Sequence, residues 1–132
     1  DGFEVGCAVC GRDSLIVGEI DEIELNETNS SDGFFDFTEK YTLKTSAIHV
    51  PARISAEKAQ EIKEVAKRIY HALDCAGFAR VDMFVTLKGE IVFNEVNTIP
   101  GFTEHSRYPG MMQAAGYGFA EIVNRIIGQA FE

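Results

Sequence analysis

Two polar pairs flank Lys88-Gly89, a dipeptide that reads as a two-residue hairpin turn. A turn of this length fixes the register of the strands on either side and places Asp82 opposite Glu95. In the same register Arg80 lies opposite Asn97. Because residues two apart in a strand share a face, both pairs should form one cluster on one side of a sheet.

This cluster is suited to binding a divalent cation and phosphate. Two facing carboxylates destabilise a sheet unless a cation compensates them. Mg²⁺ takes one or two carboxylates with a neutral oxygen, such as the Asn97 amide, and leaves room for water and phosphate. Arg80 adds a fixed charge that fits phosphate oxygens. Two alternatives stay open: Arg80 only neutralises two surface acids, or the ion is Ca²⁺, although an EF-hand loop is absent.

The acid and base pair of a glycosidase fits this cluster poorly. Such a pair needs two carboxyl groups in differently tuned environments on either side of a cleft. Nothing in the sequence separates the surroundings of the two carboxylates. We therefore favour the metal interpretation.

Strands are expected around the cluster and upstream of it. We predict two strands at 78–87 and 90–97, and an upstream hairpin of 5–9 and 15–25 around residues 11–13. The face of the first pair that points away from the cluster forms the natural core side, with Val81, Met83, Val85, Leu87, Val92 and Val96. Residues 26–46 are rich in turn formers, and their length predicts a functional loop, which we interpret as a lid.

Two amphipathic helices are predicted in addition to these strands. Ser55 is a plausible N-cap for a helix that reaches residue 73. Its apolar stripe consists of Ala59, Ile62, Ala66, Ile69 and Leu73. A Pro-Gly loop is predicted at 100–110 and a second helix at 119–131, with Ile122, Val123, Ile126 and Ile127 in its stripe. This order predicts one α+β domain, in which an antiparallel β-sheet is packed against α-helices.

Composition limits the partners. The chain has 132 residues, enough for one domain, and 45% of them are hydrophobic, enough for a core. A formal net charge of -9 argues against a nucleic-acid surface. Apolar runs are too short for a membrane span and no signal peptide is recognisable, so we expect a cytoplasmic protein. Three cysteines fit reduced thiols there, and Cys7 and Cys10 read as small buried residues on opposite faces of a strand.

The motifs around the cluster resemble those of the D-alanine:D-alanine ligases, an ATP-grasp family. The resemblance rests on Phe78-Ala-Arg-Val-Asp-Met-Phe84 and on Phe93-Asn-Glu-Val-Asn-Thr-Ile-Pro-Gly-Phe102 followed by Ser106. It runs through essentially the whole chain. The string Asn94-Glu-Val-Asn-Thr with Ser106-Arg-Tyr-Pro is similar to the vancomycin-resistance branch, whose members make D-alanyl-D-serine or D-alanyl-D-lactate.

The resemblance implies roles for individual residues around a nucleotide. Asp82, Glu95 and Asn97 match ligands of Mg²⁺ (or Mn²⁺), in agreement with the hairpin register. Arg80 matches the arginine that stabilises the reacting phosphate and the tetrahedral intermediate. The resemblance also assigns Glu4, Lys40, Asn94 and Glu95 to ATP: Glu4 to the ribose and Lys40, on the loop, to the phosphates.

The resemblance further implies a second-substrate region. Gly101 and Ser106 match groups that hold the carboxylate of the second substrate and the oxyanion, and Tyr41 matches a neighbour of the substrates. His105 either lines the site or is a surface histidine. Where D-alanine ligases often carry Leu after the serine, this chain has Arg107, which favours the resistance branch and, with Lys40-Tyr41, D-serine as acceptor.

The implied activity is ATP- and Mg²⁺-dependent ligation of D-alanine to D-alanine or D-serine for peptidoglycan precursors, as in glycopeptide resistance. The chain lacks an initiator Met and reads as a carboxyl-terminal fragment without the amino-terminal domains of the same protein. We therefore expect it to be inactive alone, and the intact parent to form a homodimer. The alternatives are another ATP-grasp carboxylate–amine ligase, or a non-catalytic nucleotide- or cation-binding module.

Overall fold

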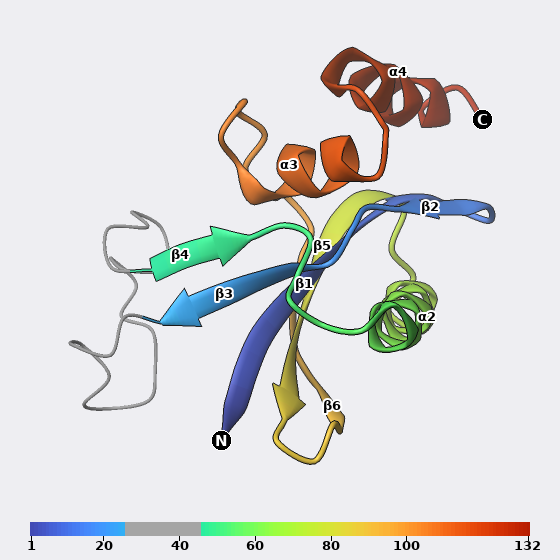
Figure 1. The fold of residues 1–132 in the computed structure, drawn as a ribbon. Coiled ribbons are helices and arrows are strands. Elements are labelled where there is room, and N and C mark those ends of the chain that lie inside the picture. The colour runs from blue at the N-terminus through green and yellow to red at the C-terminus, as the bar shows by residue number, and fades with distance from the viewer. Residues whose placement is uncertain (26–45) are drawn as a thin grey trace.

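The computed structural model describes residues 1–25 and 46–132. They form one antiparallel sheet with helices on both faces (Figure 1), which confirms the predicted α+β class. The strands are β1 (Gly2–Gly11), β2 (Leu15–Val17), β3 (Asp21–Leu25), β4 (Ser46–His49), β5 (Gly77–Thr86) and β6 (Ile91–Asn97). Their order is β4-β3-β1-β5-β6, and β2 pairs with β1 as the predicted hairpin. In this part of the chain no helix is long and apolar enough to cross a membrane.

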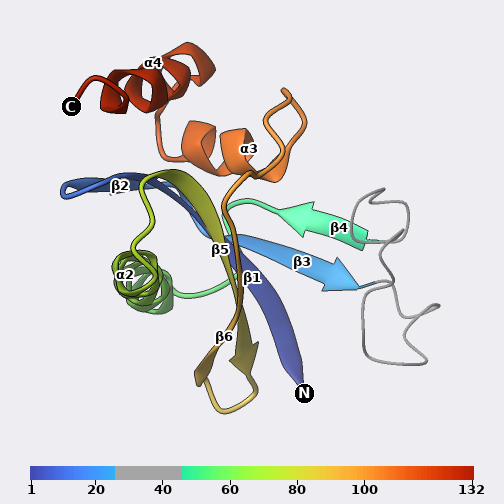
Figure 2. The ribbon, with the colours of Figure 1, turned by 180° about the vertical axis from the view of Figure 1, so that it is seen from behind.

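Helix α2 (Ala56–Ala72) covers one face of the sheet (Figures 1 and 2). Its predicted N-cap is confirmed, because the Ser55 hydroxyl accepts a hydrogen bond from the backbone N–H of Lys58 at 3.1 Å. Ile62 and Ala66 are buried as expected, whereas Leu73 is exposed. The stripe also contains Tyr70, whose hydroxyl donates to the Gly11 carbonyl at 2.6 Å and ties the helix to β1.

Helices α3 (Arg107–Ala114) and α4 (Phe119–Gln129) lie against the opposite face. They bury Tyr108, Met111, Met112 and Ile122 with alternate residues of β1. Cys7 packs in the core under α2 and Cys10 in this second cluster, and both are buried free thiols, as the sequence predicted. Burial raises the pKa of the Cys7 thiol to about 12, so it stays protonated at neutral pH.

The β5–β6 hairpin has the predicted pairing at the cluster but a different turn. Thr86 N–H donates to the Glu90 carbonyl at 2.9 Å, so residues 87–89 form a three-residue turn with Gly89 at φ 86°. A bulge at Asn94 then restores the register, because Met83 pairs with Phe93 while Asp82 pairs with Glu95. The prediction of a two-residue turn was wrong, yet the pairing it implied holds at the carboxylates.

The shifted register also moves two predicted core residues. Val92 lies opposite Phe84, on the face away from α2, and is 45% exposed. Leu87 belongs to the turn and is 82% exposed. Because side chains alternate between faces, one extra residue in the turn is enough to reverse the direction of Val92.

Two further boundaries differ from the prediction. The strand expected at 15–25 is interrupted at Gly18, where the N–H of Glu19 donates to the Met111 carbonyl at 2.9 Å. A Cβ at Gly18 would lie 2.8 Å from the Met111 backbone, so the break lets α3 approach closely. Helix α3 begins at Arg107, inside the loop predicted at 100–110. Pro109 does not prevent this, because it lies in the first turn of the helix, where proline is tolerated.

Candidate active site

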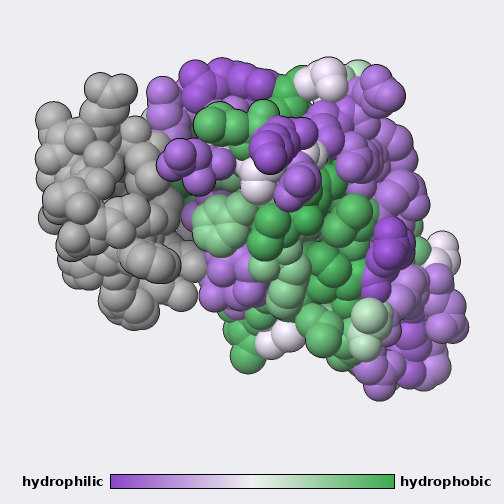
Figure 3. All heavy atoms as spheres, turned by 90° about the horizontal axis from the view of Figure 1, so that it is seen from below, coloured by the Kyte–Doolittle hydropathy of each residue, from purple (hydrophilic) through white to green (hydrophobic). Residues whose placement is uncertain are grey.

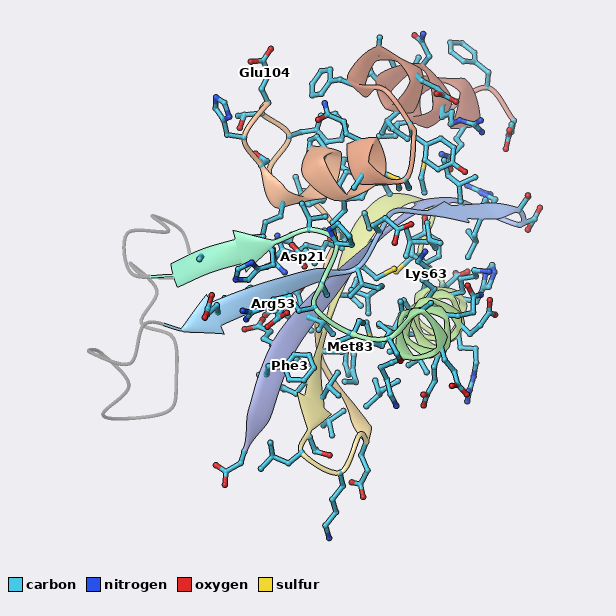
Figure 4. All side chains as sticks on the ribbon, in the orientation of Figure 1. Phe3, Asp21, Arg53, Lys63, Met83 and Glu104 are labelled. Atoms are coloured by element: carbon cyan, nitrogen blue, oxygen red, sulfur yellow. The ribbon has the colours of Figure 1, made fainter. Side chains whose placement is uncertain are left out.

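One row of side chains crosses four strands on the face that carries α3. Gly6 of β1 pairs with Asp21 of β3 on one side and with Asp82 of β5 on the other, and Asp82 pairs with Glu95 of β6. We call Asp21, Gly6, Asp82 and Glu95 the acidic row. Asp21 and Asp82 are fully buried, and Figure 4 shows Asp21 where the strands meet the loop before α3. Sheet pairing thus aligns three carboxylates along one row, with β1 separating Asp21 from Asp82 and Glu95.

Arg80 binds the central carboxylate of this row. Its Nε donates to Asp82 Oδ1 at 2.8 Å and its Nη2 donates to Asp82 Oδ2 at 2.9 Å. The two residues are neighbours on one face of β5, as predicted. Asn97 lies opposite Arg80 in the ladder, and its amide oxygen accepts a hydrogen bond from the Ile99 N–H at 3.3 Å. The four residues of the predicted cluster therefore lie together.

Arg107, the first residue of α3, supplies a second guanidinium. Its Nε and Nη2 donate to the two oxygens of Asp21 at 2.7 and 2.9 Å, and Nη2 lies 3.7 Å from Asp82 Oδ1. The absence of a side chain at Gly6 makes room for it, because a Cβ there would be 2.6 Å from Arg107 Nη2. Burial by itself would lower the pKa of Arg107, but the hydrogen bonds and charge of Asp21, with the charge of Asp82, outweigh it and raise the pKa.

An apolar row runs beside the acidic one. Glu4 lies between Ile23 of β3 and Phe84 of β5, and Phe84 pairs with Val92 of β6. Phe84 is 42% exposed, and Figure 3 shows apolar side chains gathered at the end of the molecule that includes this hairpin. Glu4 is buried on this face, two residues from Gly6. Exposed apolar side chains thus adjoin the charged groups.

The predicted second-substrate residues meet at the start of α3. A Cβ on Gly101 would lie 3.1 Å from Ser106 Oγ, so the two residues are in contact. Ser106 Oγ accepts a hydrogen bond from the Thr103 N–H at 2.9 Å. A pocket of about 280 Å³ opens here, lined by Asp21, Ile48, Val50, Glu104, His105, Ser106, Arg107 and Gly110. It adjoins the acidic row at Asp21, whose partner Arg107 also lines it, whereas the predicted magnesium ligands are not part of its wall. Figure 4 shows Glu104 at the outer tip of the loop.

The remaining site predictions fall elsewhere. Asn94 is the extra residue of the β6 bulge and is exposed next to Glu95. Lys40 and Tyr41 lie outside the described residues, as do residues 26–45 of the predicted lid, whereas Ser46, its last residue, begins β4. Sequence reasoning missed Asp21 and Gly6. A glycine inside an apolar strand was the signal that could have found Gly6. Asp21 lies among Glu19, Glu22 and Glu24, and no local signal distinguishes it from these acids.

The donor set fits the predicted ion. Asp82 and Glu95 offer carboxylate oxygens and Asn97 an amide oxygen, the ligand types that Mg²⁺ prefers. Over residues 1–25 and 46–132, no three His, Cys, Asp or Glu side chains gather into a metal-binding group. The predicted site has only two carboxylates, and its other ligands would be the Asn97 amide and nucleotide phosphates, so it does not need such a group.

Comparison with known proteins decides the family. A family model described as "D-ala D-ala ligase C-terminus" matches residues 1–128. The chain belongs to the D-alanine–D-alanine ligase family. Among its relatives, vancomycin C-type resistance protein VanC2 of Enterococcus casseliflavus is 47% identical over 99% of the chain, and VanA of Enterococcus faecium is 49% identical over 96%.

Solved structures agree with this assignment. The VanG D-Ala:D-Ser ligase of Enterococcus faecalis is similar with a TM-score of 0.84 and 63% identity over 98% of the chain. The D-alanine-D-alanine ligase of Coxiella burnetii is similar with a TM-score of 0.79 and 29% identity over 98% of the chain. The chain spans 36% of the length of VanC2 and 37% of VanA, so most of each relative lies outside the matched region.

Proposed function

We propose that the intact protein containing this chain joins D-alanine to a second D-amino acid at the expense of ATP, for peptidoglycan precursors. The observation that carries this proposal is the acidic row with Arg80 and Arg107, in a chain of the D-alanine–D-alanine ligase family. In the proposed reaction the carboxylate of D-alanine takes the γ-phosphate to form an acyl phosphate and releases ADP. The amine of the second substrate then attacks the carbonyl carbon, and phosphate leaves.

Asp82, Glu95 and Asn97 would hold Mg²⁺ or Mn²⁺ between the sheet and the phosphates. The metal would neutralise negative charge on the phosphates. Arg80 would donate its two parallel N–H groups to phosphate oxygens, for which a guanidinium has matching geometry. Much of the rate then comes from positioning and from charge, as in other phosphoryl transfers.

The neighbouring apolar row suits the rest of the nucleotide. Phe84 and Val92 offer exposed apolar surface for a base, and Glu4 lies in the same row with a carboxylate that can accept hydrogen bonds from ribose hydroxyls. Asn94, beside Glu95, remains our predicted nucleotide contact on β6. We assign Lys40 to the phosphates and Tyr41 to the substrates on the resemblance alone.

The corner at Gly101 and Ser106 would bind the second substrate. The carboxylate of this substrate can lie at the amino-terminal end of α3, where backbone N–H groups point outward and favour an anion. Arg107 keeps its charge and lies in the pocket wall, so it can donate to a hydroxyl group. The Arg107 guanidinium in this wall supports D-serine over D-alanine as the preferred acceptor, in line with the D-Ala:D-Ser activity named for VanG.

The test is product identification with the intact protein. Purified protein would receive Mg-ATP and D-alanine with D-serine, D-alanine or D-lactate, and mass spectrometry would identify the dipeptide or depsipeptide. We expect D-alanyl-D-serine as the main product. D-alanyl-D-alanine as the main product would refute the acceptor assignment, and no product with any of the three would point to another ATP-grasp ligase or a binding module.

The metal assignment has its own variant. Asp82→Asn keeps the size of the side chain and removes the charge, and we expect the ligation rate to fall by on the order of 100-fold or more. Asp74→Asn is the matched control, because Asp74 is an exposed turn residue at φ 55°, which asparagine tolerates. An unchanged rate and magnesium dependence in Asp82→Asn would contradict the assignment.

A further inference from the structure

We infer that Arg80 occupies the metal-binding carboxylate of Asp82 until a nucleotide is present, so that the site accepts a divalent cation together with phosphate groups and excludes the free ion. The inference rests on the proposed use of a magnesium nucleotide and assigns Arg80 a second task, that of a gate on metal binding. It depends on the contacts of Asp82 in the absence of ligand.

Arg80 engages both oxygens of Asp82. The Nε–Oδ1 and Nη2–Oδ2 distances are 2.8 and 2.9 Å, which is the bidentate geometry of a strong charge-assisted pair. The Asp82 side chain is fully buried and that of Arg80 is 10% exposed, so water screens the pair weakly. A free cation therefore meets a carboxylate whose charge is already compensated.

Arg107 strengthens this exclusion from the other side. Its Nη2 lies 3.7 Å from Asp82 Oδ1, while Asp21 holds the rest of the guanidinium. The Arg107 side chain is 8% exposed and fills the space that the missing side chain of Gly6 leaves open. A divalent ion at Asp82 would thus lie next to two fixed positive charges in a poorly screened place, and this repulsion opposes its binding.

Phosphate groups change this balance. A guanidinium binds phosphate in the same bidentate way as carboxylate, so Arg80 can exchange the Asp82 oxygens for phosphate oxygens without losing its partners. Asp82 is then available opposite Glu95, with Asn97 one row away. The negative charge of the phosphates also offsets Arg107. The phosphates also raise metal affinity as ligands, whatever Arg80 does. The observation specific to the gate is therefore a gain in nucleotide-free metal binding when the Arg80 charge is removed.

Binding of Mn²⁺ tests the inference without any turnover. Electron paramagnetic resonance counts free Mn²⁺ in titrations of the intact protein, with and without a non-hydrolysable ATP analogue. We expect the affinity of the natural protein for Mn²⁺ to be at least about tenfold weaker without the analogue. In Arg80→Gln, which keeps hydrogen-bond donors and loses the charge, we expect nucleotide-free Mn²⁺ affinity to rise at least about tenfold.

Three variants make the result specific to this site. Arg80→Lys keeps the positive charge and should still exclude free Mn²⁺. The double variant Arg80→Gln, Glu95→Gln should lose the gained binding. Arg125→Gln, which removes an exposed ion pair with Glu121 on α4, should behave as the natural protein. Circular dichroism checks that each variant is folded.

Three outcomes would overturn the gate. They are equal Mn²⁺ affinity of the natural protein with and without the analogue, no gain in a folded Arg80→Gln variant, or a gain that survives Glu95→Gln. The first outcome needs no variant. A protein that makes D-alanyl-D-serine and still binds free Mn²⁺ tightly would refute the gate and leave the proposed function standing.

Discussion

Gly6 shows how a residue without a side chain can determine a site. It stands between Asp21 and Asp82 in the acidic row, and the Arg107 guanidinium fills the space above it. Two buried ion pairs, Arg80 with Asp82 and Arg107 with Asp21, are thereby placed side by side. Burial of such pairs costs desolvation energy, and charged groups in perturbing surroundings cluster at functional sites, which agrees with a site for phosphate and a cation.

Substitution of Gly6 should therefore disturb the row. In Gly6→Ala the new Cβ would lie 2.6 Å from Arg107 Nη2 and 2.7 Å from Asp21 Oδ1, so the guanidinium must move. We expect a loss of about 1–3 kcal/mol in the free energy of unfolding, measured by urea titration, because the site is overpacked. The Michaelis constant of the second substrate in the intact protein should rise as well.

Gly128→Ala is the control for this substitution. Gly128 lies in α4, where an added Cβ would meet nothing within 4 Å, and alanine in a helix is more favourable than glycine by about 0.5–1 kcal/mol. Its free energy of unfolding should stay equal or rise. If Gly6→Ala were as stable as the natural chain, the close approach of Arg107 to the sheet would not matter for folding.

At the scale of elements, the β3–β4 ribbon is fastened by charges on the face opposite the acidic row. Arg53 donates to Glu22 from its Nε at 3.2 Å, its Nη2 at 2.8 Å and its backbone N–H at 3.0 Å. His49 contacts Glu24 at 2.5 Å on the same two strands. These contacts hold the edge strand β4, whose residue Ile48 lines the pocket, against the sheet.

Low pH should weaken the contacts that stabilise the β3–β4 ribbon. The hydrogen bonds from Arg53 lower the pKa of Glu22 below its ordinary value, which is about 4.3. The charged carboxylate therefore stabilises the fold above about pH 4.3, and this contribution disappears as the pH falls through the lower, folded pKa. We expect Glu22→Gln to lower the free energy of unfolding by about 1 kcal/mol at pH 7.

The pH dependence distinguishes this pair from ordinary packing. In urea titrations between pH 3 and 7, the difference between the natural chain and Glu22→Gln should shrink toward the acid end. Glu57→Gln, in the first turn of α2, is the comparison variant for a surface acid. A difference that stays constant over this pH range would mean that Glu22 stabilises the ribbon by something other than its charge.

At the scale of the whole molecule, the sheet presents its acidic and apolar rows side by side on one face. The chain spans a little over a third of the length of VanC2 and VanA. ATP-grasp ligases hold nucleotide between two lobes, and this family resemblance underlies our expectation that residues 1–132 provide one of them. The acidic and apolar rows of this chain can contact a nucleotide from one side only.

We accordingly expect the isolated 132-residue polypeptide to show no D-alanine-dependent ATP hydrolysis. A coupled phosphate-release assay with Mg-ATP and D-alanine would measure this, with the intact protein as the positive control. Weak nucleotide binding by the isolated polypeptide agrees with the prediction, because a single face can still contact the ligand. Turnover by the isolated polypeptide would refute it and would place every essential group within residues 1–132.

Local sequence determined the elements and one half of the site. The apolar period and the Ser55 cap gave α2 within a residue, and the hairpin register placed Asp82 opposite Glu95 and Arg80 opposite Asn97. These features depend on residues close together in the chain, so their pattern is visible in it. The pairing was reached through a turn of the wrong length, which the bulge at Asn94 compensates.

Only the tertiary structure decided the other half. Asp21 and Arg107 are 86 residues apart in sequence, and their contact depends on β3 pairing with β1, on α3 lying against the sheet and on the space above Gly6. No local period encodes such a contact, because it arises from the packing of three separate elements. The sequence therefore predicted which charges could bind a metal and a phosphate, and the fold determined which guanidinium each carboxylate holds.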